Sequence, residues 1–215
     1  TTRRPVCRHG TETLQSQAEA ATAFQAWGTI WAYLYCSARA FFFSTDLQEQ
    51  YYPFAEDFGP VNIGIVAEFC KTLRAKMEDP RLNQRHIVYY CTHDAETVTN
   101  TVFLLAAYLM LDQGSSPNSA VEAFSCFPAL PVIPFRDIHN HQDFPLSVHN
   151  CIRCLQRAEK CGWLSNFSAE QYFELEAPAN GDAHIMCPKF VAFRGPDQRI
   201  ASELAHHLKK FVDTF

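Results

Sequence analysis

The stretch from residue 85 to residue 114, RHIVYYCTHDAETVTNTVFLLAAYLMLDQG, constrains the fold more than any other part of this 215-residue chain. Its first eight residues are rich in β-branched and aromatic side chains, which predicts a short buried strand. Residues 95–112 are apolar at helical spacing and Gly114 follows them as a stop signal, so we expect a long helix there. A strand, a short loop and a helix in direct succession are typical of an α/β domain.

Further strands and helices are indicated along the rest of the chain. Residues 29–38 and 39–45 favour two strands that could pair antiparallel. Three prolines make 128–137 a connector. Start and stop signals predict helices over 60–79, near Pro117, over 145–161 and over 168–177, and strands at 183–187 and 189–195. We therefore expect an α/β fold with a central mixed sheet flanked by helices.

The loop at 91–97 has the layout of a phosphate-binding cradle without its chemistry. Such a cradle combines backbone N–H groups at a helix N-terminus with a cation that clamps the anion. Counting six residues from Cys91 gives Thr97 and not arginine, no glycine is present, and Asp94 and Glu96 would repel a phosphate. We expect this degenerate phosphate loop not to catalyse. An ordinary strand–helix unit with a buried Cys91 is the alternative.

A second phosphatase-like spacing, C-x5-R, joins Cys151 to Arg157 in HNCIRCLQR. The surrounding residues follow helical spacing up to Gly162, which acts as a stop. Positions six apart on a helix are separated by roughly 9 Å of rise and about 120° of rotation. The two side chains therefore cannot converge on one phosphate, and we interpret the spacing as coincidence.

The cysteines and histidines of this region resemble parts of a zinc site. The candidates are His139, His141, His149, Cys151, Cys154 and Cys161. The three cysteines fall on one apolar helical stripe, where small hydrophobic residues are expected, rather than in compact pairs on turns. We expect neither a metal nor another cofactor, and we interpret the nine cysteines as reduced.

Composition narrows the classes of partner. The net charge of −5 argues against a nucleic-acid binder and is compatible with a basic peptide partner. No apolar run is long enough to span a membrane, and the N-terminus has no apolar signal region. We expect an intracellular protein of the nucleus, cytoplasm or cytoskeleton, without nucleic-acid or membrane partners.

Five segments carry a resemblance to a known family. FGPVN, PFRD and KFVAFRGP are specific in combination, since no helix or strand preference demands them in this order. On these segments the chain resembles the N-terminal domain of the cell-division-cycle-fourteen type mitotic-exit protein phosphatases, which are dual-specificity enzymes, over roughly residues 28–196. The matching segments are FFFSTDLQEQYYPFAEDFGPVN (41–62), IVYYCTHDAETVTNTVFLLAAYLML (87–111), IPFRD (133–137), EQYFELEAPANGD (170–182) and PKFVAFRGP (188–196).

The resemblance implies a degenerate dual-specificity-phosphatase-like domain at 28–196. A poorly ordered segment, 1–27, would precede it, and residues 197–215 would form a linker helix toward a catalytic domain. The apolar stripe of that helix would be covered by the catalytic domain or by another protein.

In the family, the first domain forms one wall of an acidic groove and the second domain carries the catalytic residues. Matching the segments places groove acids at Asp137, Glu176 and Asp182. A further family acid falls on Phe173, with Glu174 beside it. The alternative is that Glu170, Glu174 and Glu176 are a solvated helix face without a ligand.

The resemblance therefore implies the substrate-recognition half of a dual-specificity protein phosphatase, inactive by itself. Its substrates would be phosphoproteins or peptides with phosphoserine- or phosphothreonine-proline sites and a nearby basic residue. The alternative is a freestanding pseudophosphatase that acts as a scaffold or binding module, for example on a cytoskeletal or ciliary assembly.

Overall fold

The computed structural model describes residues 39–46, 51–53, 55–127, 129–138, 143–187 and 189–193. The expected N-terminal segment, the strand at 29–38 and the linker helix at 197–215 lie outside these residues. The chain divides into two compact units. Unit 1 comprises Thr1–Val61 and Phe69–Gln156, and unit 2 comprises Asn62–Glu68 and Arg157–Phe215.

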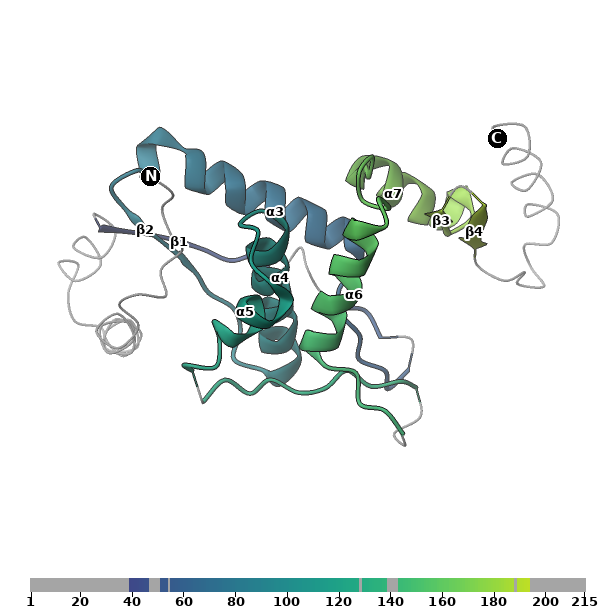
Figure 1. Ribbon diagram of the computed structural model, residues 1–215, viewed down its shortest axis with the longest axis horizontal. Helices are drawn as coiled ribbons and strands as arrows, with labels where there is room; N and C mark the ends of the chain where they lie inside the picture. The colour runs from purple at the N-terminus through teal and green to yellow at the C-terminus, as the bar shows by residue number, and fades with distance from the viewer. Residues whose placement is uncertain are drawn as a thin grey trace. The chain divides into compact units, whose positions relative to one another are not determined.

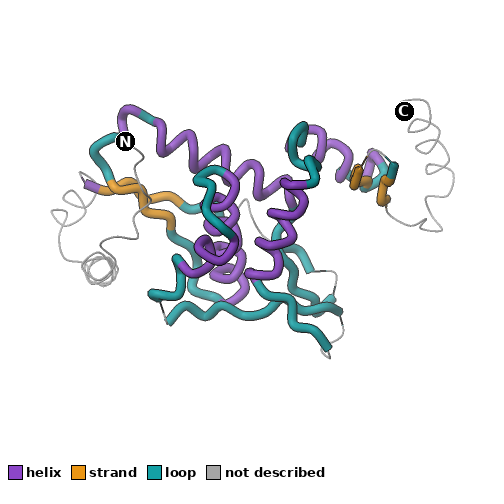
Figure 2. Tube along the Cα trace, viewed as in Figure 1, coloured by secondary structure: helices purple, strands orange, loops and turns teal. Residues whose placement is uncertain are grey.

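The described chain mixes helices and strands (Figure 1): β1 and β2 flank α3, four helices follow β2, and a pair of strands comes last. They are β1 (Ala40–Phe43), α3 (Ile63–Glu78), the 3-10 turn η1 (Pro80–Leu82), β2 (His86–Tyr89), α4 (Ala95–Leu111), α5 (Pro117–Glu122), α6 (Val148–Lys160), α7 (Ala169–Glu176), the 3-10 turn η2 (Pro178–Asn180), β3 (Ala183–Cys187) and β4 (Phe190–Phe193). The order confirms the α/β class. Within the described residues, the strands form two separate two-stranded sheets, both short (Figure 2).

The first sheet belongs to unit 1 and pairs β1 with β2. The strands run parallel, with Phe41 opposite Ile87 and Phe43 opposite Tyr89. Parallel neighbours need a crossover connection, and α3 lies between them in the sequence. Because the strands are parallel, the residues that follow β1 and those that follow β2 leave the sheet at the same edge.

Helix α4 supplies most of the core of unit 1. The sequence predicted a helix over 95–112, and the structure confirms it with bounds Ala95–Leu111. Ten of its residues are buried, including Val102, Phe103 and Leu104. Phe135 packs against Phe103 with ring centroids 6.5 Å apart, and against Phe58 at 5.1 Å. A helix that is apolar around most of its circumference is expected at the centre of a domain.

Two buried polar side chains of α4 hold irregular segments in place. The side-chain oxygen of Asn100 accepts from the Val61 N–H at 3.1 Å, and its amide donates to the Gly59 carbonyl at 3.2 Å. The Thr99 hydroxyl accepts from the Ile133 N–H at 3.0 Å. These bonds satisfy backbone groups that have no partner in a helix or strand.

The two segments held by α4 also bond to each other. Phe58 and Arg136 exchange backbone hydrogen bonds of 2.9 and 2.8 Å in a short antiparallel bridge. FGPVN and PFRD, singled out in the sequence, therefore meet on α4, although nearly eighty positions separate them. The connector at 128–137 contains no helix within its described residues, as its prolines predicted.

Unit 2 contains α7 and an antiparallel hairpin. Ser168 caps α7 by accepting from the Gln171 N–H at 3.2 Å. Strands β3 and β4 pair antiparallel, and Ala183 lies opposite Phe193. Gly181 and Asp182, with φ of 98° and 47°, form the turn before β3. The short helix and both strands predicted here are confirmed.

In the described part of the chain, no helix combines the length and apolar character that crossing a membrane requires.

Candidate functional site

The segment that we interpret as a degenerate phosphate loop connects β2 to α4 in unit 1, so the predicted succession of strand, loop and helix is confirmed. β2 ends at Tyr89 and α4 begins at Ala95. In an active cradle, backbone N–H groups of such a loop and the first turn of the helix would point at a bound phosphate. The partners of these groups in the present chain therefore decide what the loop can bind.

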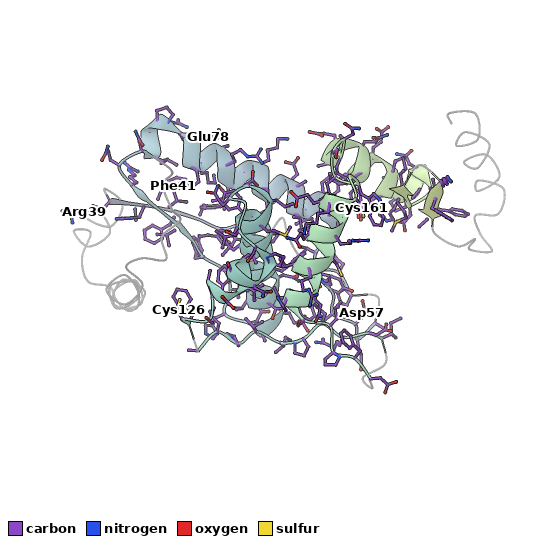
Figure 3. The ribbon with its side chains drawn as sticks, in the orientation of Figure 1. Arg39, Phe41, Asp57, Glu78, Cys126 and Cys161 are labelled. Carbon is purple, nitrogen blue, oxygen red and sulfur yellow. The ribbon has the colours of Figure 1, made fainter. Side chains whose placement is uncertain are left out.

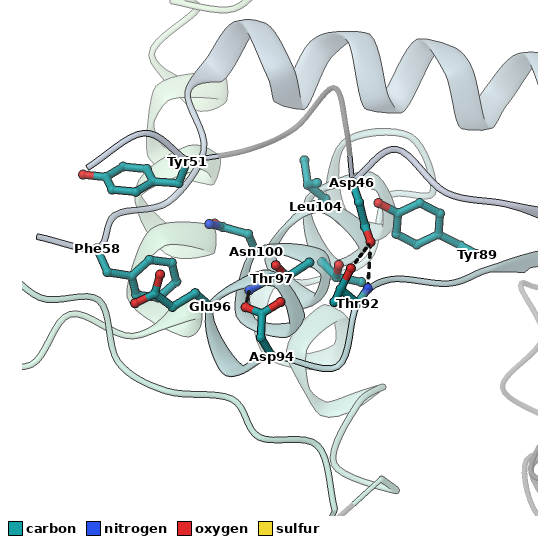
Figure 4. A pocket seen from close by; sticks show the side chains of 11 residues that line it. Asp46, Tyr51, Phe58, Tyr89, Thr92, Asp94, Glu96, Thr97, Asn100 and Leu104 are labelled. Carbon is teal, nitrogen blue, oxygen red and sulfur yellow. Dashed lines mark hydrogen bonds between the residues drawn. The ribbon is translucent and has the colours of Figure 1, made fainter. Parts of the chain in front are cut away.

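Carboxylates of the protein itself accept two of these N–H groups (Figure 4). Asp46 Oδ2 accepts from the Thr92 N–H at 2.7 Å and from the Thr92 hydroxyl at 2.8 Å. Asp94 Oδ1 accepts from the Thr97 N–H at 2.8 Å, which makes Asp94 the N-cap of α4. A phosphate would have to displace one negative charge and approach another. The geometry therefore supports a loop that excludes phosphate.

Cys91 is half-buried and poorly suited to act as a nucleophile. Burial raises the pKa of its thiol and outweighs an opposing hydrogen bond with Thr101, while the charges of Asp46 and Asp94 add smaller contributions in the same direction as burial. The thiolate is the reactive form, so a raised pKa reduces reactivity near neutral pH. Catalytic cysteines instead lie beside cations or helix N-termini that lower the pKa.

The carboxyl group of Asp94 stays ionised near neutral pH. Burial acts to raise its pKa, but the hydrogen bonds that it accepts, chiefly from the N–H and hydroxyl of Thr97, outweigh burial and leave the pKa below its ordinary value. The helix N-terminus favours the same ionised form. Asp94 thus places a fixed negative charge at the position where an active cradle would hold phosphate.

Beside the loop is a cavity of about 350 Å³. It is lined by Asp46, Tyr51, Phe58, Tyr89, Thr92, Asp94, Glu96, Thr97, Asn100, Thr101 and Leu104. Figure 4 shows the carboxylates of Asp46, Asp94 and Glu96 at separate points around it, with aromatic rings on two sides. Among the described residues, the lining includes three carboxylates and no lysine, arginine or histidine.

Glu96 pairs with an arginine from the PFRD segment. Arg136 donates to Glu96 Oε1 at 2.5 Å and to the Glu56 carbonyl at 2.8 Å. Its guanidinium carbon lies 5.6 Å from the centroid of the Phe58 ring. This charge-assisted pair partly neutralises Glu96 and leaves Asp46 and Asp94 to set the sign of the cavity.

Two of the predicted groove acids come together in unit 2, around Tyr172. Asn62 Nδ2 donates to Glu176 Oε1 at 2.9 Å, and the Tyr172 hydroxyl lies 3.5 Å from the same oxygen. Asp182 Oδ1 lies 3.8 Å from His184 Nε2. Burial and then the negative charges of Glu176 and Asp182 raise the pKa of Tyr172, so both carboxylates act on one phenol.

The other predicted acids differ in their surroundings. Glu174 is exposed on α7, and its carbonyl accepts from Asn180 Nδ2 at 2.7 Å. Phe173, which takes the place of a family acid, is 37% exposed. Asp137 belongs to unit 1, where it accepts from the Ile138 N–H at 2.7 Å. Burial and the hydrogen bond to Asp57 raise the pKa of Tyr51 to about 12, and the charge of Asp137 adds only a minor contribution. The direct role of these residues in binding stays a prediction.

The C-x5-R spacing is part of a helix, as the sequence predicted. Cys151 and Arg157 both belong to α6, and burial raises the pKa of Cys151 to about 11. The expected apolar stripe of three cysteines is wrong, because Cys154 is exposed on α6 and Cys161 is exposed beyond its last residue, Lys160; Cys126 is exposed as well (Figure 3 labels Cys126 and Cys161). His139 and His141 lie outside the described residues. Among the residues that the structure describes, no three His, Cys, Asp or Glu side chains are placed to hold a metal ion.

Comparison with known proteins identifies a family that covers the loop between β2 and α4. A family model described as "Dual specificity protein phosphatase, N-terminal half" matches residues 27–158. This chain belongs to that family. The matched residues include the degenerate phosphate loop and the FGPVN and PFRD segments, so the resemblance expected from the sequence is confirmed.

Curated members of the dual specificity phosphatase family are similar over most of this chain. Dual specificity protein phosphatase CDC14C of Homo sapiens is 30% identical over 170 residues, which are 77% of this chain and 38% of the relative. Dual specificity protein phosphatase CDC14A of Mus musculus is 31% identical over 78% of this chain and 28% of its own length. Tyrosine-protein phosphatase CDC14 of Saccharomyces cerevisiae is 28% identical over 73% of this chain and 29% of its own length. The chain thus spans about a third of the length of these relatives.

Asp46 and Asn100 are site residues that the sequence interpretation missed. Asp46 follows β1 and Thr92 follows β2, and side chains that follow parallel neighbouring strands meet at one edge of a sheet. A parallel assignment of these two strands would therefore have predicted the contact between Asp46 and Thr92. Asn100 stands within an apolar helical run. Nothing in the neighbouring sequence indicates that its side chain bonds two backbone groups.

Proposed function

We propose that this chain is the substrate-recognition half of a dual-specificity protein phosphatase and has no phosphatase activity of its own. Its substrates are phosphoproteins with a phosphoserine- or phosphothreonine-proline site and a nearby basic residue. A separate catalytic domain supplies the thiolate, the arginine and the general acid that break the phosphate ester.

One observation carries the inactive part of this proposal. Asp46 and Asp94 accept hydrogen bonds from the N–H groups of Thr92 and Thr97, which belong to the degenerate phosphate loop. The loop has no arginine, and the thiol of Cys91 has a raised pKa. Each of the three requirements of cysteine-based phosphoryl transfer, namely anion binding, a clamping cation and a thiolate, is therefore unmet here.

The recognition part is supported by Glu176 and Asp182. Both carboxylates lie close to Tyr172 in unit 2, and both belong to the segment EQYFELEAPANGD that carries the family resemblance. A carboxylate pair of this kind favours a basic side chain chiefly through electrostatic preference and steering. Single exposed ion pairs contribute only about 0–1 kcal/mol, so we expect weak but selective binding.

The proposal makes a distinction that peptide binding can test. Because the phosphate belongs to the catalytic domain, this chain should discriminate peptides by their basic residue and not by their phosphate. Four labelled peptides with a serine-proline site serve as probes in fluorescence anisotropy: phosphorylated or not, and with lysine or norleucine after the proline. We expect the lysine peptides to bind more tightly and phosphorylation to add nothing.

The variant pair Glu176→Gln and Asp182→Asn should abolish the preference for lysine. Glu122→Gln is the matched control, since Glu122 is an exposed carboxylate on α5. Equal affinity for lysine and norleucine peptides would refute the recognition role. The presence of a catalytic domain can be tested directly by affinity capture of the native polypeptide. Peptide mass spectrometry of the captured material should then detect peptides of a C-x5-R loop.

A further inference from the structure

The cavity beside the degenerate phosphate loop has the properties of a binding site for a cation. It lies within unit 1 and so is separate from Glu176 and Asp182 of unit 2. Its volume of about 350 Å³ falls at the lower end of the range for ligand sites, roughly 300–1,000 Å³. A concave site lined by charges of one sign attracts ions of the opposite sign.

The arrangement of the carboxylates favours a large organic cation over a metal ion. Asp46, Asp94 and Glu96 come from three separate positions around the cavity (Figure 4). In the described part of the chain, no three acidic, histidine or cysteine side chains converge closely enough to hold a metal. A cation that spans several ångströms, with donors pointing outward, can reach carboxylates that a single ion cannot.

Arg136 demonstrates which cation the wall of this cavity accepts. Its guanidinium group pairs with Glu96 at 2.5 Å and lies over the ring of Phe58, and both residues line the cavity. Aromatic faces and carboxylates together suit a planar guanidinium better than a compact ammonium. Because Arg136 already pairs with Glu96, a second guanidinium would meet the charges of Asp46 and Asp94 and the aromatic rings of Tyr51 and Tyr89.

We propose that this cavity binds the guanidinium group of an arginine residue from a partner polypeptide. The site would thus have the position of a phosphate cradle and the opposite charge preference. The inference goes beyond the proposed function and does not rest on it, since it concerns other residues and needs neither a phosphopeptide nor a catalytic domain.

The test is an NMR titration of the ¹⁵N-labelled 215-residue chain with N-acetyl-L-arginine methylamide. The amides of Thr92 and Thr97 report on the cavity, since both residues line it. We expect saturable shifts at ligand concentrations of about 1–20 mM, as befits a few solvent-open polar contacts. The lysine analogue should bind more weakly, and inorganic phosphate should not shift these amides in a saturable way.

Variants that remove charge but keep hydrogen bonds give the sharpest comparison. Asp46→Asn and Asp94→Asn retain an oxygen that can accept from Thr92 and Thr97, and asparagine is as good an N-cap as aspartate. We expect each to weaken arginine binding about threefold to fivefold and the double variant about tenfold or more. Glu122→Gln, which removes one exposed charge elsewhere in unit 1, should leave the affinity unchanged.

The proposal is overturned by an absence of saturable shifts, by phosphate binding as tightly as arginine, or by unchanged affinity in the double variant. Circular dichroism establishes that each variant is folded. If the double variant is unfolded, Asp46→Asn decides alone, because Asp46 belongs to no helix and its loss of charge leaves the cap of α4 intact. Free L-arginine distinguishes an arginine residue of a polypeptide from the free amino acid as the ligand. The α-carboxylate of free arginine should weaken binding relative to the blocked residue.

Discussion

Asn100 is the residue whose replacement should destabilise unit 1 most informatively. It is 6% exposed and bonds the Val61 N–H and the Gly59 carbonyl, while Val61 itself is 5% exposed. Asn100→Ala would leave a buried N–H without a partner, which costs about 1–3 kcal/mol, and would lose a second bond worth about 1 kcal/mol. We expect the free energy of unfolding to fall by about 2–4 kcal/mol, a large share of the usual 5–15 kcal/mol.

Equilibrium urea unfolding, followed by circular dichroism, measures this loss. Asn166→Ala is the control, because Asn166 is exposed and its replacement should change stability by less than about 0.5 kcal/mol. Asn100→Leu separates hydrogen bonding from packing, since leucine fills most of the volume but bonds neither backbone group. If Asn100→Leu restores the stability of the parent chain, the loss came from a cavity and the reasoning about backbone satisfaction is wrong.

Three further predictions follow from single contacts. Asp94→Ala should lower the free energy of unfolding by about 1 kcal/mol through loss of the N-cap, while Asp94→Asn should preserve it at pH 7. Because the folded state lowers the pKa of Asp94, its stabilisation is present above about pH 4 and lost as pH falls through the folded pKa, so urea midpoints from pH 7 to pH 3 should fall more steeply in the parent than in Asp94→Asn. Iodoacetamide at pH 7.5 should alkylate exposed Cys154 at least about tenfold faster than half-buried Cys151, because burial raises the pKa of Cys151 to about 11. Peptide mass spectrometry measures both rates, and equal rates would contradict the burial of Cys151. Gly64→Ala should destabilise the protein by about 1 kcal/mol or more despite the better helix propensity of alanine, because the added carbon would stand 2.6 Å from Cδ1 of Tyr172. Thermal unfolding measures this change, and a raised midpoint would show that the ring moves aside.

The sequence predicted the elements of unit 1 better than their pairing. Periodicity and stop signals located α4 to within one residue, because Gly114 and the polar loop before Ala95 mark its ends. The pairing of β1 with β2 is a long-range contact, and the β-branched and aromatic residues of both strands carry no information on direction. The parallel arrangement, and with it the place of Asp46, could be established only from the fold.

The chemistry of the degenerate phosphate loop was predictable in part. The missing arginine and the acids at Asp94 and Glu96 were evident in the sequence and predicted that the loop does not catalyse. Their partners were not evident, since Arg136 and Asp46 lie forty and forty-six positions away from Glu96 and Thr92. The tertiary contact with Asp46 occupies the N–H and hydroxyl of Thr92, which the sequence alone does not indicate.

The specific motifs FGPVN and PFRD have a physical explanation in the structure. Phe58 is fully buried, the Val61 N–H needs Asn100, and Phe58 and Arg136 exchange backbone bonds. The sequence pointed to these motifs through resemblance alone, because their residues stabilise one another only after the chain has brought them together on α4.

The most direct test of the central claim, that this domain does not catalyse, is phosphate release from para-nitrophenyl phosphate. The 215-residue chain and its Cys91→Ser variant are assayed side by side at pH 7. Because the loop lacks a clamping cation and Cys91 has a raised pKa, we expect neither protein to release phosphate above the buffer blank. Steady turnover in either protein would contradict the claim, and turnover that Cys91→Ser abolishes would identify Cys91 as the nucleophile.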